Sequence, residues 1–117
     1  MTASSPAHFL PLKPDVFEIL LALSHGELHG YAILKELEER SVPVAASLLY
    51  RKLRRLMQDD LVAEVRRRVV HPEDDQRRRY YRLTAAGRAV VRAEAARIVS
   101  LAGDRRIRVL AEGASHA

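Results

Sequence analysis

The sequence predicts a mainly α-helical chain that carries one two-stranded β-hairpin, and three observations support this fold class. Apolar residues recur at helical spacing in four segments of the chain. Residues 61–84 instead alternate apolar and polar positions on both sides of a polar tip. Pro72 and the pair Asp74–Asp75 supply that tip with turn-forming residues. A hairpin inserted between helices accounts for this pattern.

The first two helices are expected within the first forty residues. Pro14 suits the first position of a helix, and the mostly apolar segment that follows it should end near Gly26. A second helix is expected over about residues 29–39. Its apolar face would consist of Tyr31, Leu34 and Leu37.

The third and fourth helices flank the hairpin. A third helix is expected over about residues 44–58, because three leucines recur there at helical spacing and should face inward: Leu49, Leu53 and Leu56. Thr84 is the expected N-cap of a fourth helix that runs to at least Ala102. Gly103 should weaken that helix, which either ends there or kinks.

The hairpin strands each have a predicted buried face. On the outgoing strand it comprises Leu61, Ala63 and Val65, and on the returning strand it comprises Tyr81 and Leu83. Tyr80 should lie on the opposite face, together with arginine triplets at residues 66–68 and 77–79. Three helices, a hairpin and a further helix form the plan of a winged helix-turn-helix, in which the hairpin is the wing.

The chain of 117 residues is expected to form one domain with a small core. We expect disordered tails at residues 1–8 and 112–117, a winged helix-turn-helix over residues 9–84, and a C-terminal dimerisation helix over residues 85–111. The absence of cysteine excludes disulfides and thiolate metal sites. No apolar run is long enough to cross a bilayer, so the expected location is the cytoplasm and no membrane partner is expected.

Basic residues are concentrated in one part of the chain. The net charge is −3 over residues 1–50, +5 over residues 51–82 and +3 over residues 83–117. The basic surplus therefore begins at Arg51, where the third helix and the wing supply most of the arginines. Such asymmetry indicates a polyanionic partner. On the third helix, the positions away from the leucines are suited to base edges or phosphate, and they are Ser47, Tyr50, Arg51, Arg54, Arg55 and Gln58.

Three segments resemble the PadR family of transcriptional regulators. They are LLALSHGELHGYAILKELEE (residues 20–39), LLYRKLRRL (residues 48–56) and RRRYYRLTAAGR (residues 77–88), and the resemblance spans roughly residues 10–102. The short C-terminal tail, a single expected helix, is similar to that of the smaller branch of the family. The resemblance implies a homodimeric bacterial repressor that binds double-stranded DNA at an inverted-repeat operator, with the third helix in the major groove.

The resemblance and the arginine pattern together identify the expected DNA-contacting residues as Tyr31, Ser47, Tyr50, Arg51, Arg54, Arg55, Arg66, Arg68, Arg77, Arg78, Arg79 and Tyr80. The sequence departs from the family pattern at two places. Ser47–Leu48 stand where the family usually has Gly-Thr, and Asp60 stands where it usually has glycine. The first departure removes a hydroxyl near the DNA and puts the detailed contacts in question, while the fold is not affected.

An apolar stripe on the fourth helix predicts a subunit interface. A three-helix winged domain already has a core, so a further apolar helix more often packs on a symmetry mate. With help from the first helix, the expected interface residues are Phe9, Phe17, Leu20, Val91, Ala95, Ile98 and Ala102. Some short family members bind planar aromatic compounds between subunits through a tryptophan. This chain has no tryptophan, so that pocket is not expected and any effector is unknown.

Several alternatives remain open at this stage. Tyr31 is either a core aromatic or an exposed hydroxyl that touches phosphate, whereas contact with DNA is favoured for Tyr50. His25, Glu27 and His29 lack the spacing of a metal site, so a turn in which His29 caps a helix or touches phosphate is favoured. No catalytic residues, cofactor or metal are expected. The alternative function is a winged-helix interaction module whose basic face binds an acidic protein.

Overall fold

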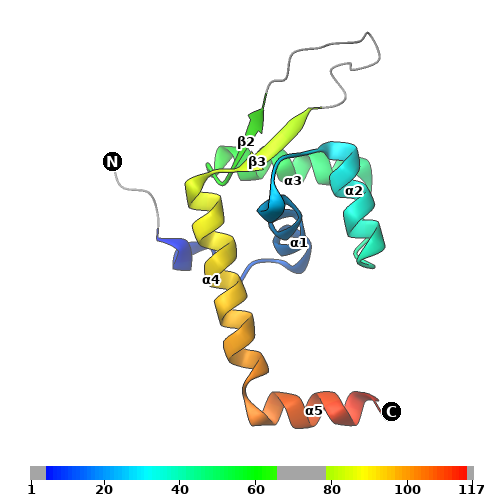
Figure 1. Cartoon of the computed structure of the whole chain (residues 1–117), viewed down its shortest axis with the longest axis vertical. Helices are drawn as coiled ribbons and strands as arrows, with labels where there is room; N and C mark the ends of the chain where they lie inside the picture. The colour runs from blue at the N-terminus through cyan, green and yellow to red at the C-terminus, as the bar shows by residue number, and fades with distance from the viewer. Residues whose placement is uncertain (1–4, 66–78, 116–117) are drawn as a thin grey trace.

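The computed structural model describes residues 5–65 and 79–115, and Figure 1 shows their arrangement. The elements in chain order are η1 (Pro6–Phe9), α1 (Pro14–Ala22), η2 (Leu23–His25), β1 (Leu28–His29), α2 (Gly30–Glu39), α3 (Ala46–Gln58), β2 (Val62–Val65), β3 (Tyr80–Leu83), α4 (Ala85–Ala102) and α5 (Arg105–Ser115). Helices α1, α2 and α3 gather beside the small sheet, whereas α4 runs out of this group and α5 turns off its far end (Figure 1). We call residues 5–95 the head and residues 96–115 the stalk.

The core lies in the head and joins the first three helices to the sheet and to the first half of α4. Its buried apolar side chains are Ile19, Leu20, Leu23, Ile33, Leu37, Leu49, Leu53, Leu56, Leu61, Val62, Tyr81, Leu83, Val90 and Val91. The three leucines predicted to face inward from α3 are all among them, which confirms the helical period of that segment. On α2 the buried residues are Gly30, Ile33 and Leu37, so the predicted apolar face was correct only at Leu37 and, in part, at half-buried Leu34.

Local capping explains where the helices begin. Pro14 is the first residue of α1, as expected. The Nδ1 atom of His29 accepts a hydrogen bond from the Ala32 amide at 3.1 Å and caps α2. The Thr84 hydroxyl accepts from the Gly87 amide at 2.9 Å and donates to the Asp60 carbonyl at 2.6 Å. The Thr84 side chain therefore joins the end of α3 to the start of α4.

The sheet has three antiparallel strands in the order β1-β3-β2, one more than the two predicted. The extra strand, β1, is only two residues long and pairs Leu28 with Tyr81. It is too short to show the alternation that reveals a strand in a sequence.

The prediction for the buried face was correct for β3 and wrong for β2. Tyr81 and Leu83 are buried, and Tyr80 lies on the opposite face of the strand. Val62, however, pairs with Leu83 and is buried, while Ala63 and Val65 lie on the other face. Leu61 is buried but precedes the strand. Leu61 is buried ahead of the strand, and Val62 is buried within it. The prediction began the alternation at Leu61, and its buried face was therefore displaced by one residue.

The C-terminal region consists of two helices rather than one helix over residues 85–111. Helix α4 ends at Ala102 with Gly103 as its C-cap, and α5 begins at Arg105. The Asp104 carboxylate accepts from the Arg106 amide at 2.8 Å, which favours a new helix start at this point. Residues 6–8 and 112–115, which were expected to belong to disordered tails, lie in η1 and α5.

Candidate nucleic-acid interface

Helix α3 presents a continuous polar face to solvent. Its leucines bury one side, and the side opposite them exposes Ser47, Arg51, Arg54, Arg55 and Gln58. These five positions follow the period of one helix face. The structure therefore brings together the α3 residues that the sequence predicted to contact DNA, with the partial exception of Tyr50.

The arginines of α3 differ in whether they form ion pairs with neighbouring carboxylates. The Arg55 Nε atom lies 3.3 Å from the Asp59 carboxylate one turn later. Arg51 and Arg54 form no ion pair with any residue that the structure describes. No carboxylate within the described ranges therefore competes with an incoming anion for these two guanidinium groups.

Lys52 belongs to the fold rather than to this face. Its ammonium group lies 2.9 Å from the Asp15 carboxylate of α1, and both side chains are largely shielded from solvent. Burial raises the pKa of Asp15, but the hydrogen bond and charge of Lys52, together with backbone hydrogen bonds, hold it below its ordinary value. Lys52 therefore joins α1 to α3, which its place in a basic segment did not reveal.

Tyr50 is half-buried at the contact between α3 and α2. A Cβ atom added to Gly30 would lie only 2.4 Å from the Tyr50 hydroxyl oxygen. Gly30 is thus required for α3 to approach the first turn of α2 this closely. In the structure the Tyr50 side chain packs between the two helices and its hydroxyl lies beside the N-terminus of α2, and its contact with phosphate stays a prediction.

Tyr31 is exposed, which excludes its interpretation as a core aromatic, whereas its contact with phosphate stays a prediction. Its side chain is 68% exposed and lies one residue after the start of α2. The His29 ring stacks with Tyr31 at a centroid distance of 6.3 Å and meets Tyr80 edge-on at 5.5 Å. The three rings connect the α2 N-terminus with the base of the wing. A hydrogen bond of 3.2 Å from the Gly30 amide to the Arg79 carbonyl joins the same two regions.

Only part of the wing lies within the described residues. Arg79 is exposed, and its Nε atom lies 3.4 Å from the Glu64 carboxylate across the hairpin. The other wing residues predicted to contact DNA are outside the described residues, namely Arg66, Arg68, Arg77 and Arg78.

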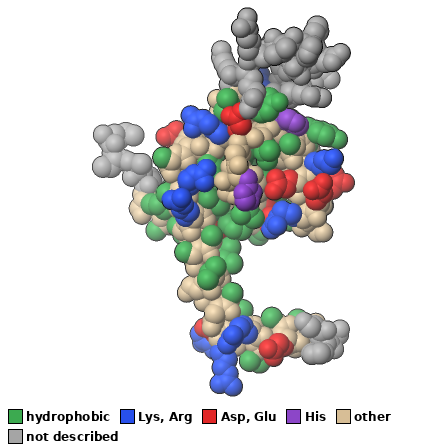
Figure 2. Space-filling view, viewed as in Figure 1, with side chains coloured by type: hydrophobic (Ala, Val, Ile, Leu, Met, Phe, Trp, Pro, Cys, Tyr) green, Lys and Arg blue, Asp and Glu red, His purple; other side chains and the backbone are tan. Residues whose placement is uncertain are grey.

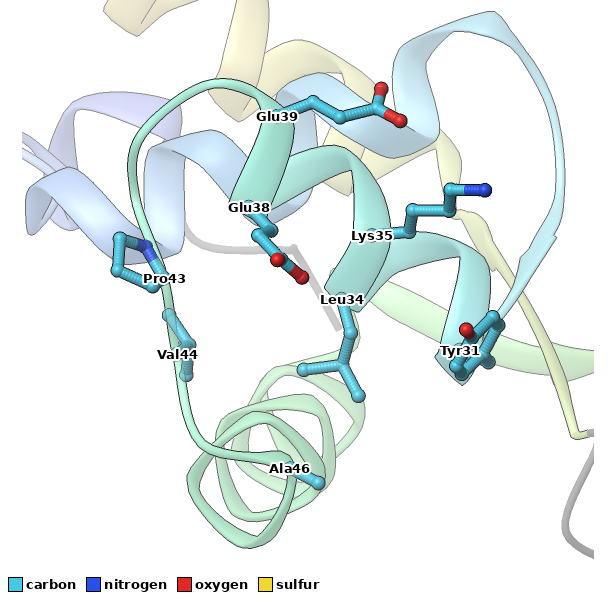
Figure 3. Close-up of a pocket in the computed structure, with 8 residues that line it drawn as sticks. All are labelled: Tyr31, Leu34, Lys35, Glu38, Glu39, Pro43, Val44 and Ala46. Carbon is cyan, nitrogen blue, oxygen red and sulfur yellow. The ribbon is translucent and has the colours of Figure 1, made fainter.

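A cavity of about 770 Å³ opens between α2, the α2–α3 loop and the start of α3 (Figure 3). Leu34, Val44 and Ala46 line its apolar part (Figure 3). Along α2, Tyr31 stands at the start of the helix, Lys35 in the middle, and the carboxylates of Glu38 and Glu39 at the end (Figure 3). These carboxylates would repel phosphate. The Tyr31 end of the cavity is therefore better suited to an anion than the Glu38 and Glu39 end.

The N-terminus of α3 adjoins this cavity and has no side-chain cap. Ala45 is the N-cap residue, no side chain bonds to the helix start, and the first turn contains no acidic residue. The unpaired amide groups of a helix N-terminus attract anions. Ser47 lies in the same turn and adds a hydroxyl group.

The residues predicted to form the subunit interface differ in their exposure. Leu20 and Val91 are buried in the core of their own chain, so the prediction that they contact a partner was wrong for these two. Phe9, Phe17 and Ala95 are half-buried, whereas Ile98 and Ala102 are exposed. The stalk exposes further large apolar side chains at Val99, Leu101, Ile107, Val109 and Leu110. Figure 2 shows hydrophobic side chains on the surface of the stalk.

The described residues contain no group of three or more side chains suited to holding a metal ion. His29 instead serves as the cap of α2, one of the two roles favoured for it. No helix within the described ranges is both long enough and apolar enough to span a membrane.

A family model for the PadR-like transcriptional regulators matches residues 19–93, well over half of the chain. The chain belongs to the PadR-like family. Members of this family are transcription factors, so this protein is a DNA-binding transcriptional regulator and not an enzyme. Family membership also favours DNA over an acidic protein as the partner of the basic face.

Solved structures resemble this PadR-like chain over most of its length. RosR from H. salinarum shares 30% sequence identity with a TM-score of 0.64, and the match covers 93% of this chain and 99% of RosR. A PadR-like transcription factor from Bacteroides fragilis shares 27% identity with a TM-score of 0.64, covering 74% of this chain and 81% of that one. PadR of Bacillus subtilis in complex with operator DNA shares 23% identity with a TM-score of 0.60, covering 71% of this chain and 47% of that one, and so shares the fold. A comparison with curated protein sequences found no match.

One departure from the family pattern now has a structural explanation. Asp60, at the position where the family usually has glycine, has a φ of 61°. This left-handed conformation is the one that glycine adopts without strain, and aspartate is among the side chains that tolerate it best. Aspartate can therefore form the left-handed turn between α3 and the wing at this position.

Proposed function

We propose that this protein is a transcriptional repressor that binds an inverted-repeat operator as a homodimer, with α3 in the major groove. The observation that carries the proposal is the exposed polar face of α3, in which Arg51 and Arg54 have no carboxylate partner among the described residues. A guanidinium group can pair with both acceptors of a guanine edge, which makes arginine the side chain most often used for base recognition.

The contacts around α3 favour a division of labour. Ser47 and the uncapped α3 N-terminus would bind phosphate, as would the exposed hydroxyl of Tyr31. Arg51, Arg54 and Arg55 would read bases or flanking phosphates. The wing arginines and Tyr80 would lie along the backbone beside the half-site.

The homodimer is supported by the exposed apolar surface of the stalk. Ile98 and Leu101 on α4 and Ile107, Val109 and Leu110 on α5 are all exposed. Large apolar side chains that gather on the surface of a small protein commonly mark an interface with another chain. A second copy, related by a two-fold axis, would cover the same surface on both subunits.

Binding titrations test the role of α3. Duplexes from the DNA upstream of the gene and scrambled duplexes of the same composition are titrated at several salt concentrations. Arg54→Ala should lose about 1–3 kcal/mol on the specific duplex and much less on the scrambled one. Arg92→Ala removes an exposed arginine from α4 and should leave both affinities unchanged. Equal losses on both duplexes for Arg54→Ala would assign that residue to phosphate contact instead.

Spacer variants test the symmetric arrangement. Two α3 helices on one face of the duplex require half-sites about 10–10.5 base pairs apart, centre to centre. Inserting five base pairs moves one half-site to the far side of the duplex, so affinity should fall toward the non-specific level. Affinity that survives the insertion would mean that each subunit binds on its own.

A further inference from the structure

Glu94 is the one charged side chain that is fully buried among the described residues, with 2% of its surface exposed. It is also the last of the buried residues of α4, after Gly87, Val90 and Val91. Beyond it, Ala96, Ile98 and the rest of the stalk are mostly exposed. Glu94 thus lies at the point where α4 leaves the head.

The Glu94 carboxylate binds two groups. Its Oε2 atom accepts a hydrogen bond of 2.8 Å from the backbone amide of Leu12, which is 82 residues away in sequence. The Arg97 guanidinium, one turn further along α4, contacts both carboxylate oxygens, with Nη2 3.2 Å from Oε2 and Nε against Oε1. No buried side-chain polar atom in the described part of the chain lacks a partner, so these contacts satisfy the carboxylate.

The hydrogen bond between Leu12 and Glu94 connects two parts of the molecule that are far apart in the sequence. Leu12 lies two residues before α1, and α1 supplies Ile19 and Leu20 to the centre of the core. The preceding turn, η1, packs beside α4, as Figure 1 also shows. The carboxylate therefore ties the base of α1 to the helix that leads into the stalk.

Stability is a poor explanation for a buried carboxylate at this position. Desolvation makes buried ion pairs costly, and apolar residues of similar volume often replace them without loss of stability. A buried hydrogen bond to a charged group instead fixes an orientation, because the carboxylate acceptor must stay aligned with one backbone amide. Apolar packing at Val90 and Val91 holds α4 against the head but allows more freedom of angle.

We infer that Glu94 is a positioning residue that sets the angle between head and stalk and thereby the preferred spacing of the two operator half-sites. The inference rests on the proposed function, because only a dimer joined through the stalk converts this angle into a distance between two α3 helices. Successive base pairs are about 3.4 Å apart along the duplex. A small change of angle at Glu94 is amplified by the length of the head into a shift of that size at α3.

The test measures spacing preference rather than affinity alone. Glu94→Met fills a similar volume but accepts no hydrogen bond, whereas Glu94→Gln keeps an oxygen that can accept from Leu12. Each variant is titrated against operators whose spacer is native or is lengthened or shortened by one and two base pairs. A duplex that carries a single half-site reports the intrinsic binding of one head.

Glu94→Met should lower the preference for the native spacer by about tenfold, within the range typical of coupling between distant sites. Its affinity for the single half-site should equal that of the wild type, because α3 is unchanged. Glu94→Gln should retain most of the preference. Glu112→Ala, which removes an exposed carboxylate from α5, should retain all of it.

Sedimentation of the same samples separates this inference from the proposed function. A wild-type protein that is monomeric and binds without any spacer preference would overturn both. A wild-type dimer whose spacer preference is unchanged in folded, dimeric Glu94→Met would overturn the role of Glu94 alone. If Glu94→Met does not fold, Glu94→Ala replaces it in the same comparison. Loss of preference in Glu94→Gln equal to that in Glu94→Met would assign the effect to charge and would also overturn the bond to Leu12 as its cause.

Discussion

The head and the stalk are built from similar apolar residues but bury them to very different extents. In the head, Leu20 on α1 has no exposed surface, and α4 contributes Val90 and Val91 to the same core. In the stalk, Ile98 is 39% exposed and Leu110 is 74% exposed. Both regions contain apolar residues at helical spacing, so spacing alone does not distinguish a face covered by its own chain from a face left open.

The difference follows from the path of the N-terminal segment. The segment that contains η1 and Leu12 packs against α4. Leu12 bonds to Glu94, which is the last buried residue of that helix. Nothing else in the described chain reaches the remainder of α4 or α5 (Figure 1). The head can therefore form its core alone, whereas the stalk requires a partner to remove its apolar surface from water.

The largest contrast is expected from placing the same charge in each region. Leu20→Asp buries a carboxylate without a partner and should cost more than about 4 kcal/mol, enough to prevent folding. Ile98→Asp should leave the head folded, with a normal circular dichroism spectrum, but should yield monomers in analytical ultracentrifugation and a collapse of operator affinity. An Ile98→Asp variant that stays dimeric with normal affinity would place the interface outside this part of the stalk.

The next contrast concerns two glycines. A Cβ at Gly87 would lie 1.9 Å from the Leu61 carbonyl oxygen, so Gly87→Ala must displace backbone and should lower the free energy of unfolding by about 3 kcal/mol. A Cβ at Gly113 in α5 meets no atom within 4 Å. Gly113→Ala should therefore stabilise α5 by up to about 1 kcal/mol, as expected for a helix interior. Urea denaturation measures both, and similar effects at the two positions would contradict the tight contact in the head.

Acidification should act at the boundary between the two regions. The Arg97 guanidinium and the Leu12 amide hold the pKa of Glu94 below its ordinary value, against the effect of burial. A depressed pKa means that this contribution to stability is present above the unfolded value of about 4.3 and is lost as the pH falls through the folded value. Thermal unfolding at pH 7 and at pH 3 should show a smaller acid-induced loss for Glu94→Gln than for the wild type. The same loss in both proteins would exclude Glu94 as a source of acid sensitivity.

The smallest effect is expected at the turn before the wing. Asp60 has a φ of 61°, so Asp60→Gly removes left-handed strain and should raise stability by about 0.5 kcal/mol after the entropic cost of glycine. Asp59, with a φ of −83°, has no such strain to lose. Asp59→Gly should therefore lower stability. If both variants are destabilised in urea denaturation, the left-handed turn is not strained.

Much of the head could be predicted from the sequence because its signals are local. The leucines of α3 recur at one spacing, Pro14 and Thr84 mark helix starts, and Tyr81 and Leu83 alternate on β3. The polar face of α3 followed from the same period. The short strand β1 and the phase of β2 did not, because two residues cannot show a period and the strand begins directly after buried Leu61.

The sequence by itself determined the helical period of α3, the family and the face of α3 that carries the arginines. Only the tertiary structure decided which cations and apolar residues remain available. Lys52 is paired with Asp15, Leu20 and Val91 are covered by their own chain, and Glu94 is bound to Leu12. Each of these outcomes depends on contacts between residues far apart in sequence, and local periodicity contains no information about which distant segment packs on a given face.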